Sequence, residues 1–352
     1  MTRALALLGV AVAFADIHAC DLCGCYTPQI EAMPQPDATA PFGQAAASSD
    51  LPSWTRGIYA AVAEQFTHFG TLQFEGEEVA NPTDEYLDSS IMQVVAGYTI
   101  NRWFAAQINA PLIYRSFERP AGFSIDRGTE AGLGDISLLV KAVAFHVEAL
   151  ARKETVSDGK NTAEITHDPD LTASAILLAG VKFPTGSAER LKEEFHEIDI
   201  PGAPESSVHG HDLTLGTGSY DAIIGGQASL RYKECFFQAD AQYAARTEGA
   251  HQYRFANDFA WSAGPGVYFV RNRHTICGCQ AVVSGEHKGL DEFRGAPAVD
   301  TGITSVFLGP RFLISLGKVS GELAAELPLS NDNTALQVVP DYRLRGSIAI
   351  RF

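Results

Sequence analysis

The sequence predicts an all-β protein, namely a transmembrane antiparallel β-barrel of about 12 strands with both ends in the periplasm. The first observation is the last strand-like segment, in which apolar and polar residues alternate up to an aromatic final residue, Phe352. The second is that no run of about 18 apolar residues follows the amino-terminal region, although 46% of the chain is hydrophobic. A membrane would therefore have to be crossed by strands. The third is that short and long connections alternate, as in bacterial outer-membrane barrels.

The amino terminus resembles a secretory signal peptide over residues 1–19. Arg3 precedes an apolar run that is too short to span a bilayer, and small residues surround two cleavage positions, after Ala15 and after Ala19. Cleavage after Ala19 would leave Cys20 as the first residue. Because His18 stands where a bacterial lipoprotein signal has a small residue, acylation of Cys20 is the less favoured alternative.

Residues 20–50 are rich in cysteine, proline and alanine and predict an extended segment before the barrel. This segment either hangs in the periplasm or enters the lumen as a partial plug. Residues 51–352 are predicted to form the outer-membrane barrel.

Alternation with a period of two marks the strands in order, each about 9 to 11 residues long or somewhat longer. They are expected at 54–69, 88–100, 103–115, 133–146, 172–183, 220–232, 236–246, 255–270, 274–286, 304–316, 319–329 and 342–352. In the third and seventh, the lumen is expected to receive Gln107 and Asn109, and Gln238, Asp240, Gln242 and Arg246.

The connections between these strands support the same topology. Short turns are expected at 101–102, 233–234, 270–273 and 317–318, and long loops at 70–87, 117–132, 184–219, 287–303 and 330–341. The connection at 147–171 is long where a short turn is expected. Either the adjoining strands extend beyond the membrane there, or the count is off by a hairpin.

A soluble β-sandwich would also alternate apolar and polar faces, but it would not explain the signal peptide, Phe352 and the connection lengths together. The net charge of -16 argues against nucleic acid as a partner.

Three glycine-containing segments resemble one known family. They are Gly132-Leu133-Gly134-Asp135-Ile136, Gly180-Val181-Lys182-Phe183-Pro184-Thr185-Gly186 and Leu215-Gly216-Thr217-Gly218-Ser219-Tyr220-Asp221. They are similar to segments of the outer-membrane transporter family named for the meta-cleavage pathway of phenol degradation, and the resemblance covers roughly residues 54–352. It implies a pore or channel without fixing the solute. The glycines themselves are expected at barrel rims, where sharp reversals or close backbone approach require them.

Charged residues of the last strands are predicted to face the lumen by alternation. One interpretation is a charged constriction that selects solutes by sign; the favoured one is a ladder of ion pairs across the wall. The residues are Arg311, Glu322, Glu326, Arg343, Arg345 and Arg351.

The long loop at 184–219 carries seven acidic residues against Arg190 and Lys192, together with His209 and His211. If it folds inward, it would narrow the pore and concentrate cations at the mouth. A solvated loop is the commoner meaning of such a charge run. The two histidines are a weak signal for a metal site.

Six cysteines are unexpected in such a barrel, and all are predicted near its periplasmic end. In an oxidising periplasm they favour disulfides, with Cys235 as the favoured barrel partner of the amino-terminal group. The alternative is a thiolate site for copper or zinc, and no other cofactor is expected. The six are Cys20, Cys23, Cys25, Cys235, Cys277 and Cys279.

These features favour a passive channel for small solutes, including hydrophobic or aromatic ones, in the outer membrane of a Gram-negative bacterium. No Gly-x-Ser-x-Gly elbow is present, so an enzyme is not expected. The alternative is a metal-handling or redox-linked protein that meets a periplasmic partner at the cysteine cluster. The expected partners are outer-membrane lipid, small solutes and the barrel-assembly machinery, for which Phe352 is the predicted signal.

Overall fold

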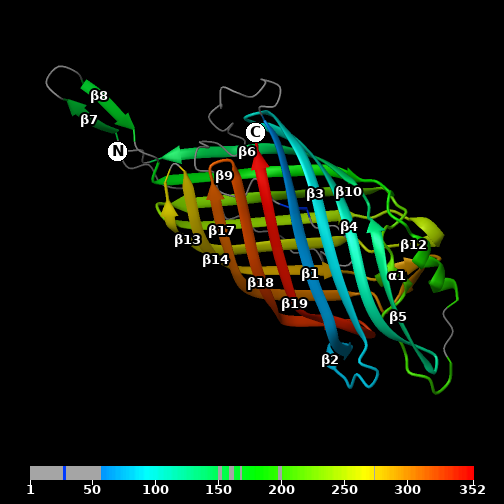
Figure 1. Ribbon diagram of the computed structural model, residues 1–352. Coiled ribbons are helices and arrows are strands. Elements are labelled where there is room, and N and C mark those ends of the chain that lie inside the picture. The colour runs from blue at the N-terminus through cyan, green and yellow to red at the C-terminus, as the bar shows by residue number, and fades with distance from the viewer. Residues whose placement is uncertain are drawn as a thin grey trace, which may run out of the picture.

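The chain forms a closed antiparallel barrel (Figure 1). The computed structural model describes residues 27–28, 57–149, 153–157, 162–166, 169–196, 200–272 and 274–352. Twelve strands make the barrel wall: β1 (Ile58–Phe74), β3 (Tyr86–Asn101), β4 (Phe104–Ala121), β6 (Ser137–Ala149), β9 (Leu171–Lys182), β10 (Asp221–Tyr232), β11 (Cys235–Ala245), β13 (Asp258–Arg271), β14 (Thr275–Lys288), β17 (Ile303–Leu316), β18 (Val319–Asn333) and β19 (Leu336–Arg351).

The wall closes where β19 pairs with β1, in a register that runs from Tyr59 opposite Arg351 to Phe74 opposite Leu336. Closure leaves no open sheet edge among the barrel strands, which is the condition for a sheet to span hydrocarbon. The prediction of an all-β barrel of twelve strands is confirmed.

Alternation places apolar side chains outside and polar ones inside. On β4, Ile108 and Leu112 are 44% and 41% exposed, whereas Gln107 and Asn109 are 1% and 2% exposed. This inverts the pattern of a soluble protein, because the outer surface faces lipid and the lumen is hydrated. On β11, Gln238 and Gln242 are likewise buried inside the wall. The face assignments made from the sequence are confirmed for these two strands.

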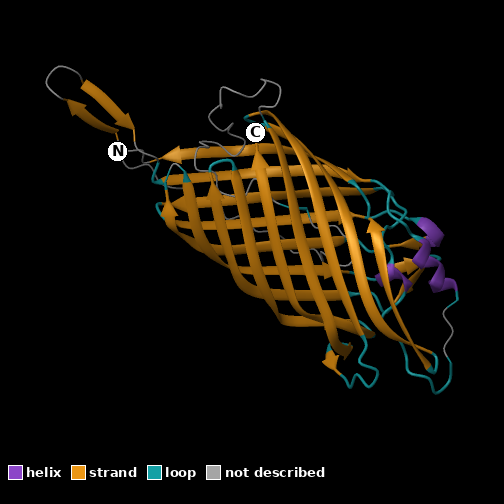
Figure 2. Cartoon of the chain, in the orientation of Figure 1, coloured by secondary structure: helices purple, strands orange, loops and turns teal. Residues whose placement is uncertain are grey.

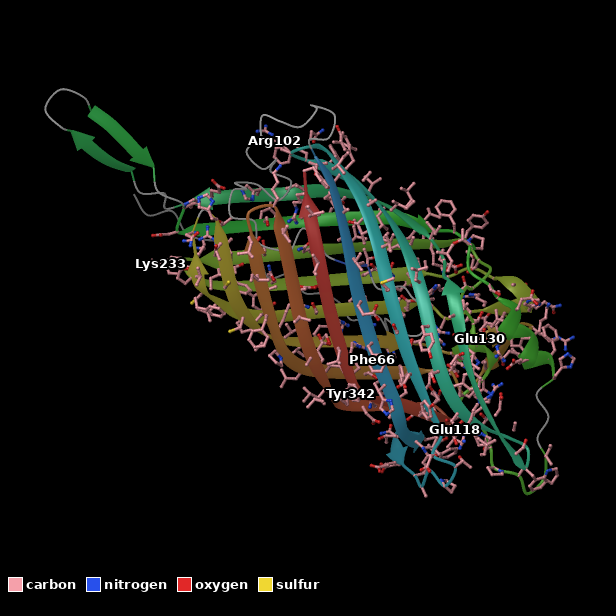
Figure 3. All side chains as sticks on the ribbon, in the orientation of Figure 1. Phe66, Arg102, Glu118, Glu130, Lys233 and Tyr342 are labelled. Atoms are coloured by element: carbon pink, nitrogen blue, oxygen red, sulfur yellow. The ribbon has the colours of Figure 1, made fainter. Side chains whose placement is uncertain are left out.

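The two ends of the barrel differ in their connections and in charge. The carboxy-terminus and the short turns lie at one end, and the helices and long loops lie at the other (Figure 2). Figure 3 shows Arg102 and Lys233 at the short-turn end, and Glu118 and Glu130 at the long-loop end. We call these the periplasmic and extracellular ends, because short turns are periplasmic in barrels of this kind.

Several predicted loops are strands that continue beyond the membrane. The prediction of a loop at 117–132 is wrong, because β4 runs to Ala121 and pairs with β5 (Ser124–Leu133). Charged pairs such as Arg127 with Glu118, at 2.6 Å, hold this extension together. Apolar alternation does not detect a hairpin of that kind. The loop expected at 330–341 is likewise mostly β18 and β19.

Shorter strands complete the loops. β2 (Glu77–Glu78) pairs with the end of β1. β12 (Tyr253–Arg254), β15 (Asp291–Phe293) and β16 (Ala296–Ala298) form a separate three-stranded sheet. Two helices, η4 (Glu189–Phe195) and α1 (Gly210–Leu213), belong to the loop between β9 and β10. No helix among the described residues is long and apolar enough to cross a membrane.

The long periplasmic connection at 147–171 holds a hairpin of its own. β7 (Lys153–Ser157) pairs only with β8 (Thr162–Thr166) and stands outside the barrel sheet (Figure 1). The predicted strand count therefore holds. Of the predicted segment 20–50, the structure describes only Thr27 and Pro28, which are both buried.

Candidate functional site

Arg343 is the centre of a charged wall inside the lumen. It is 1% exposed, and its Nη2 atom donates to Glu286 Oε1 at 2.7 Å. Its guanidinium carbon lies 3.8 Å from the centroid of the Phe307 ring, and Glu326 lies 3.9 Å from Nη1. Burial of a guanidinium is tolerated here because two carboxylates and a ring face replace its water.

The other predicted arginines extend this wall. Arg345 lies 3.4 Å from Glu326 and donates to Gln65 Oε1 at 2.7 Å. Arg311 lies 3.9 Å from Glu322. Arg351 is separate from these pairs, near the periplasmic rim, where it donates to Ser320 at 3.4 Å. The structure thus brings Arg311, Glu322, Glu326, Arg343 and Arg345 together in ion pairs on one side of the lumen.

The facing wall carries mainly uncharged polar groups, contributed by β10, β11 and β13. Gln227, Gln238 and Gln242 are each less than 9% exposed. Asp240 accepts a hydrogen bond from Ser262 Oγ at 2.5 Å. We call this level, where the two walls face each other, the waist.

An apolar shelf lies on the periplasmic side of the waist. Phe236 and Tyr268 stack with ring centroids 4.3 Å apart, and Ile276 and Leu313 complete the cluster. All four side chains are at most 7% exposed and occupy lumen-facing positions. The interior of the barrel therefore contains a packed apolar cluster as well as polar groups.

The three segments that carry the family resemblance converge at the extracellular rim. Lys182 Nζ lies 3.1 Å from Asp135 and 2.6 Å from Asp221, and Arg246 lies 2.9 Å from Asp221 and also pairs with Asp258. We call these five residues the rim cluster. Their side chains are at most 4% exposed. Such a buried network holds because every charge in it has an opposite partner.

The glycines of those segments allow the close approach. A Cβ atom on Gly186 would lie 2.9 Å from Gly216 Cα and 3.0 Å from the carbonyl carbon of Gly134, so larger residues would separate the backbones. Asp135 then accepts hydrogen bonds from the amides of Gly186 and Thr217, both at 2.9 Å. The sequence interpretation found the glycines but missed the rim cluster. The sequence feature that could have indicated the rim cluster is the charged residue at a lumen-facing position in or beside each glycine segment.

The long loop between β9 and β10 folds inward and covers the extracellular mouth. We call its described residues, 184–196 and 200–219, the cap (Figure 2). Val208 and Leu213 of the cap are fully buried against Leu87 and Phe117 of the barrel wall. The apolar contact explains why an acidic loop docks in the mouth instead of remaining solvated.

Polar contacts fasten the cap to the wall. Arg115 donates to the carbonyl oxygens of Asp212 and, at 2.5 Å, Thr214. Glu85 accepts from the amides of Ser207 at 2.8 Å and Val208 at 3.2 Å. Burial raises the pKa of Glu85, although these amides oppose the shift.

His211 lies enclosed inside the cap. Its Nδ1 atom lies 3.1 Å from Glu194 Oε1, and its Nε2 atom lies 3.4 Å from Asp212 Oδ1. The ring stacks between His209 and Tyr253, at centroid distances of 5.5 and 5.8 Å. Burial opposes its charge, but Asp212 and Glu194 overcome that effect and raise its pKa to about 10.

His209 is engaged separately, with its Nε2 atom 3.4 Å from Asp300. No group of three or more potential ligands among the described residues is arranged to hold a metal ion. His211 makes its carboxylate contacts within the cap, whereas His209 contacts Asp300 outside it.

The cysteines of the barrel face outward near the periplasmic end. Cys235 is exposed, Cys277 and Cys279 are half-buried, and no disulfide joins any of the three to another cysteine that the structure describes. Cys235 and Cys279 flank Val267 on neighbouring strands. Two strand spacings separate them by about 9–10 Å, which is beyond disulfide reach. Cys20, Cys23 and Cys25, and with them the predicted disulfide or copper or zinc site, lie outside the described residues.

Phe352 lies at the closure of the barrel. Its amide donates to Ile58 O at 2.9 Å, and the Gly57 amide donates to Phe352 O at 3.3 Å. The side chain is 38% exposed. The final residue therefore takes part in the pairing of the last strand with the first.

No protein-family model matches the chain, and no curated protein matches it. Among solved structures it is similar to an outer-membrane channel from Pseudomonas putida F1, with a TM-score of 0.53 and 13% identity over 87% of this chain and 100% of that chain. The β domain of the Bordetella autotransporter BrkA gives a TM-score of 0.42 and 11% identity over 84% of this chain and 99% of that one. The monoaromatic hydrocarbon channel CymD gives a TM-score of 0.33 and 8% identity over 84% of this chain and 88% of that chain.

The first similarity shows that the fold is shared with an outer-membrane β-barrel, and the other two are too distant to support any argument. Together with the closed wall and the apolar outer surface, the shared fold places the protein in the outer membrane of a Gram-negative bacterium.

Proposed function

We propose that the protein is an outer-membrane channel through which small amphipathic or aromatic solutes diffuse. The observation that carries this proposal is the lumen itself. Its waist is polar and carries ion pairs, and the packed cluster of Phe236, Tyr268, Ile276 and Leu313 adds apolar side chains to the interior. Diffusion through such a lumen needs no catalytic group.

The glycine segments support a finer assignment. Their resemblance to the transporter family named for the meta-cleavage pathway of phenol degradation rests on the stretches that meet beside the rim cluster. We propose membership of that family, without transferring phenol as the solute.

The cap supports regulated or restricted entry. Its apolar anchors and its contacts from Arg115 and Glu85 hold it in the extracellular mouth. A solute must therefore pass beside the cap or wait for it to move. Either route limits the channel to small solutes.

Purified full-length protein in planar bilayers tests the proposal. We expect discrete ion conductance, and vesicles containing the protein should swell in small aromatic solutes faster than in a disaccharide. Heat-modifiable migration on gels verifies that the barrel is folded in the same sample. A folded barrel that neither conducts ions nor admits any solute would overturn the channel function.

A further inference from the structure

Asp135, which lies outside the cap, binds both of its ends. Its Oδ1 atom accepts a hydrogen bond from the Gly186 amide at 2.9 Å. Its Oδ2 atom accepts from the Thr217 amide at 2.9 Å and from the Thr217 hydroxyl at 2.8 Å. Gly186 and Thr217 are each the third residue from an end of the cap. A single carboxylate therefore joins the two stems by which the cap leaves and re-enters the barrel wall.

The charges of the rim cluster balance without Asp135. Lys182 lies 2.6 Å from Asp221. Arg246 pairs with the same Asp221 and with Asp258. These two cations thus have two carboxylate partners when Asp135 is left aside. Because Asp135 is 7% exposed, its own oxygens need donors, and the cap stems supply three of them.

The backbone on both sides of Asp135 also pairs with the stems. Thr185 Oγ1 donates to Gly134 O at 2.9 Å and accepts from the Ile136 amide at 2.8 Å. The stems pair with each other where the Gly216 amide donates to Ser187 O at 2.9 Å. This end of the cap is therefore fixed at the rim in one arrangement.

The tip of the cap, residues 206–213, reaches the opposite side of the mouth. Its Val208 and Leu213 belong to a buried cluster with Phe69 of β1 and Val338 of β19. In the closed sheet, β19 lies six strands from β10 in either direction around the wall. The tip is therefore held by the wall that faces the one from which the cap emerges.

Only non-covalent contacts hold the tip, whereas the chain itself attaches the stems to β9 and β10. A cavity of about 20 Å³ interrupts the packing between tip and wall, and its lining includes Asp212 of the cap and Phe69 and Gln337 of the wall. The cavity has room for about one water molecule. Movement of the cap must therefore begin at the tip and leave the stems in place.

We propose that the cap is a lid and that Asp135 is the positioning residue about which it turns. Release of the tip from β1, β3 and β19 opens the mouth, while Asp135 keeps both stems at the rim. Water at the opened mouth replaces the partners that Glu85 and Arg115 lose. This assignment rests on the proposed channel function and names the device that opens its entrance.

Single-channel recording of the full-length protein in planar bilayers tests the tip first. Leu213→Ala weakens the tip alone, where this side chain is fully buried. The ratio of open to closed time should increase by at least about tenfold, as expected for truncation of a buried leucine, with the open-level current unchanged. Leu316→Ala is the matched control, because it makes the same substitution at a 54% exposed position at the end of β17, and it should change neither quantity.

The hinge is tested by two substitutions of Asp135 in the same recordings. Asp135→Ala removes the acceptor from both stems, so the open state should lose its single current level. Asp135→Asn keeps a carbonyl oxygen for one amide and should restore that level in part. Heat-modifiable migration verifies that each barrel is folded, and the asparagine variant carries the hinge test if the alanine variant does not fold.

The outcomes separate the lid from the channel. If neither the wild type nor Leu213→Ala conducts as a folded barrel, the channel function is refuted and the lid with it. Conductance in which Leu213→Ala changes the open-level current instead of the open time overturns the lid alone. So does an open level in the folded Asp135 variants that is single and equal to that of the wild type.

Discussion

Arg343 illustrates how a single residue can stabilise the wall and set its charge. It contacts Glu286, Glu326 and the face of Phe307 while almost completely buried. Removing one partner of a buried ion pair costs far more than removing a surface pair, because the remaining carboxylate keeps its desolvation penalty. Variants of Arg343 can therefore be used to measure the stability of the barrel and the ion selectivity of its lumen in separate experiments.

Replacing Arg343 with Met should lower the free energy of unfolding by about 3 kcal/mol, since Glu286 loses its buried partner. Urea unfolding in lipid vesicles, followed by tryptophan fluorescence, measures this. Arg351→Met is the control, because that side chain is only half-buried and donates a hydrogen bond to Ser320 near the rim, and the change should cost under about 1 kcal/mol. Equal losses for the two variants would contradict the central position of Arg343.

The charge preference of the lumen should depend on the same arginines. Replacing Arg343, Arg345 and Arg351 together with Gln removes three positive charges, among them the ion-pair partners Arg343 of Glu286 and Arg345 of Glu326. We expect a shift toward cations in the reversal potential measured across a salt gradient. A reversal potential equal to that of the wild type would refute the selectivity role while leaving the barrel unaffected.

The geometry of the barrel limits which of the cysteines can form disulfides with one another. Cys235 and Cys279 are too far apart to bridge each other, so a disulfide of Cys235 needs another partner, and we expect it among Cys20, Cys23 and Cys25. We expect these three to be oxidised or to hold a soft metal, with Cys235 as the favoured barrel partner. Mass spectrometry of non-reduced protein with parallel metal quantification tests this. Six free thiols without metal would contradict both forms.

At the scale of elements, the cap is the part whose stability depends on pH. The groups that surround His211 come from four elements: Glu194 of η4, His209 and Asp212 at α1, Tyr253 of β12 and Lys288 of β14. Burial, followed by the nearby Asp291, raises the pKa of Tyr253 well above 10, so that phenol stays neutral. The titration of His211 therefore dominates above neutral pH.

Raising the pH should loosen the cap. The pKa of His211 rises from 6.5 to about 10 in the folded cap, so its contribution is complete below pH 6.5 and is lost as pH increases toward 10. The loss is at most about 1.4 kcal/mol per pH unit. The pKa of Glu194 is lowered: burial opposes this, but His211 outweighs it, so that contribution is lost only in acid.

Single-channel conductance from pH 6 to pH 10 measures this effect. Wild-type conductance should increase over that range, whereas His211→Asn should conduct more at pH 6 and vary little. His274→Asn changes an exposed histidine at a periplasmic turn and should behave as the wild type. If the wild type and His211→Asn gave parallel pH profiles, His211 would not hold the cap.

The sequence allowed the barrel strands to be predicted because lipid imposes a strict alternation on them. Gln107 and Asn109, for example, could be placed inside without coordinates. The hairpin of β4 and β5 was missed, because outside the membrane charged pairs such as Glu118 with Arg127 replace apolar alternation. Which strands lie opposite one another across the lumen could not be predicted, because that depends on the curvature of the closed sheet.

The contacts within the rim cluster could not be predicted from the sequence either. Lys182 and Asp221 could each be assigned to the lumen by alternation, yet nothing local indicates that Asp135 joins them. That contact requires the backbones of Gly134, Gly186 and Gly216 to meet. Contacts of this kind are set by the closure of the whole sheet and not by any one segment.

At the scale of the whole molecule, the barrel is complete only when β19 pairs with β1. These strands are separated by almost the entire chain, so closure is a long-range event that local propensity does not secure. Until it happens, both strands present open edges inside a membrane, where unpaired backbone groups are costly. We therefore expect assembly to be assisted at this seam, where Phe352 lies at the periplasmic end.

Deleting Phe352 should impair assembly, because it removes both the aromatic side chain and the hydrogen bonds with Ile58 and Gly57. Two further variants separate these contributions. Phe352→Ala keeps the backbone bonds and loses the ring, and Phe352→Tyr keeps both. If the ring is the signal read by the assembly machinery, the deletion and the alanine variant should both accumulate less folded barrel in outer membranes, as judged by heat-modifiable migration. The tyrosine variant should assemble normally. A defect in the deletion alone would assign the effect to seam closure, and wild-type insertion of all three would refute an assembly role for this residue.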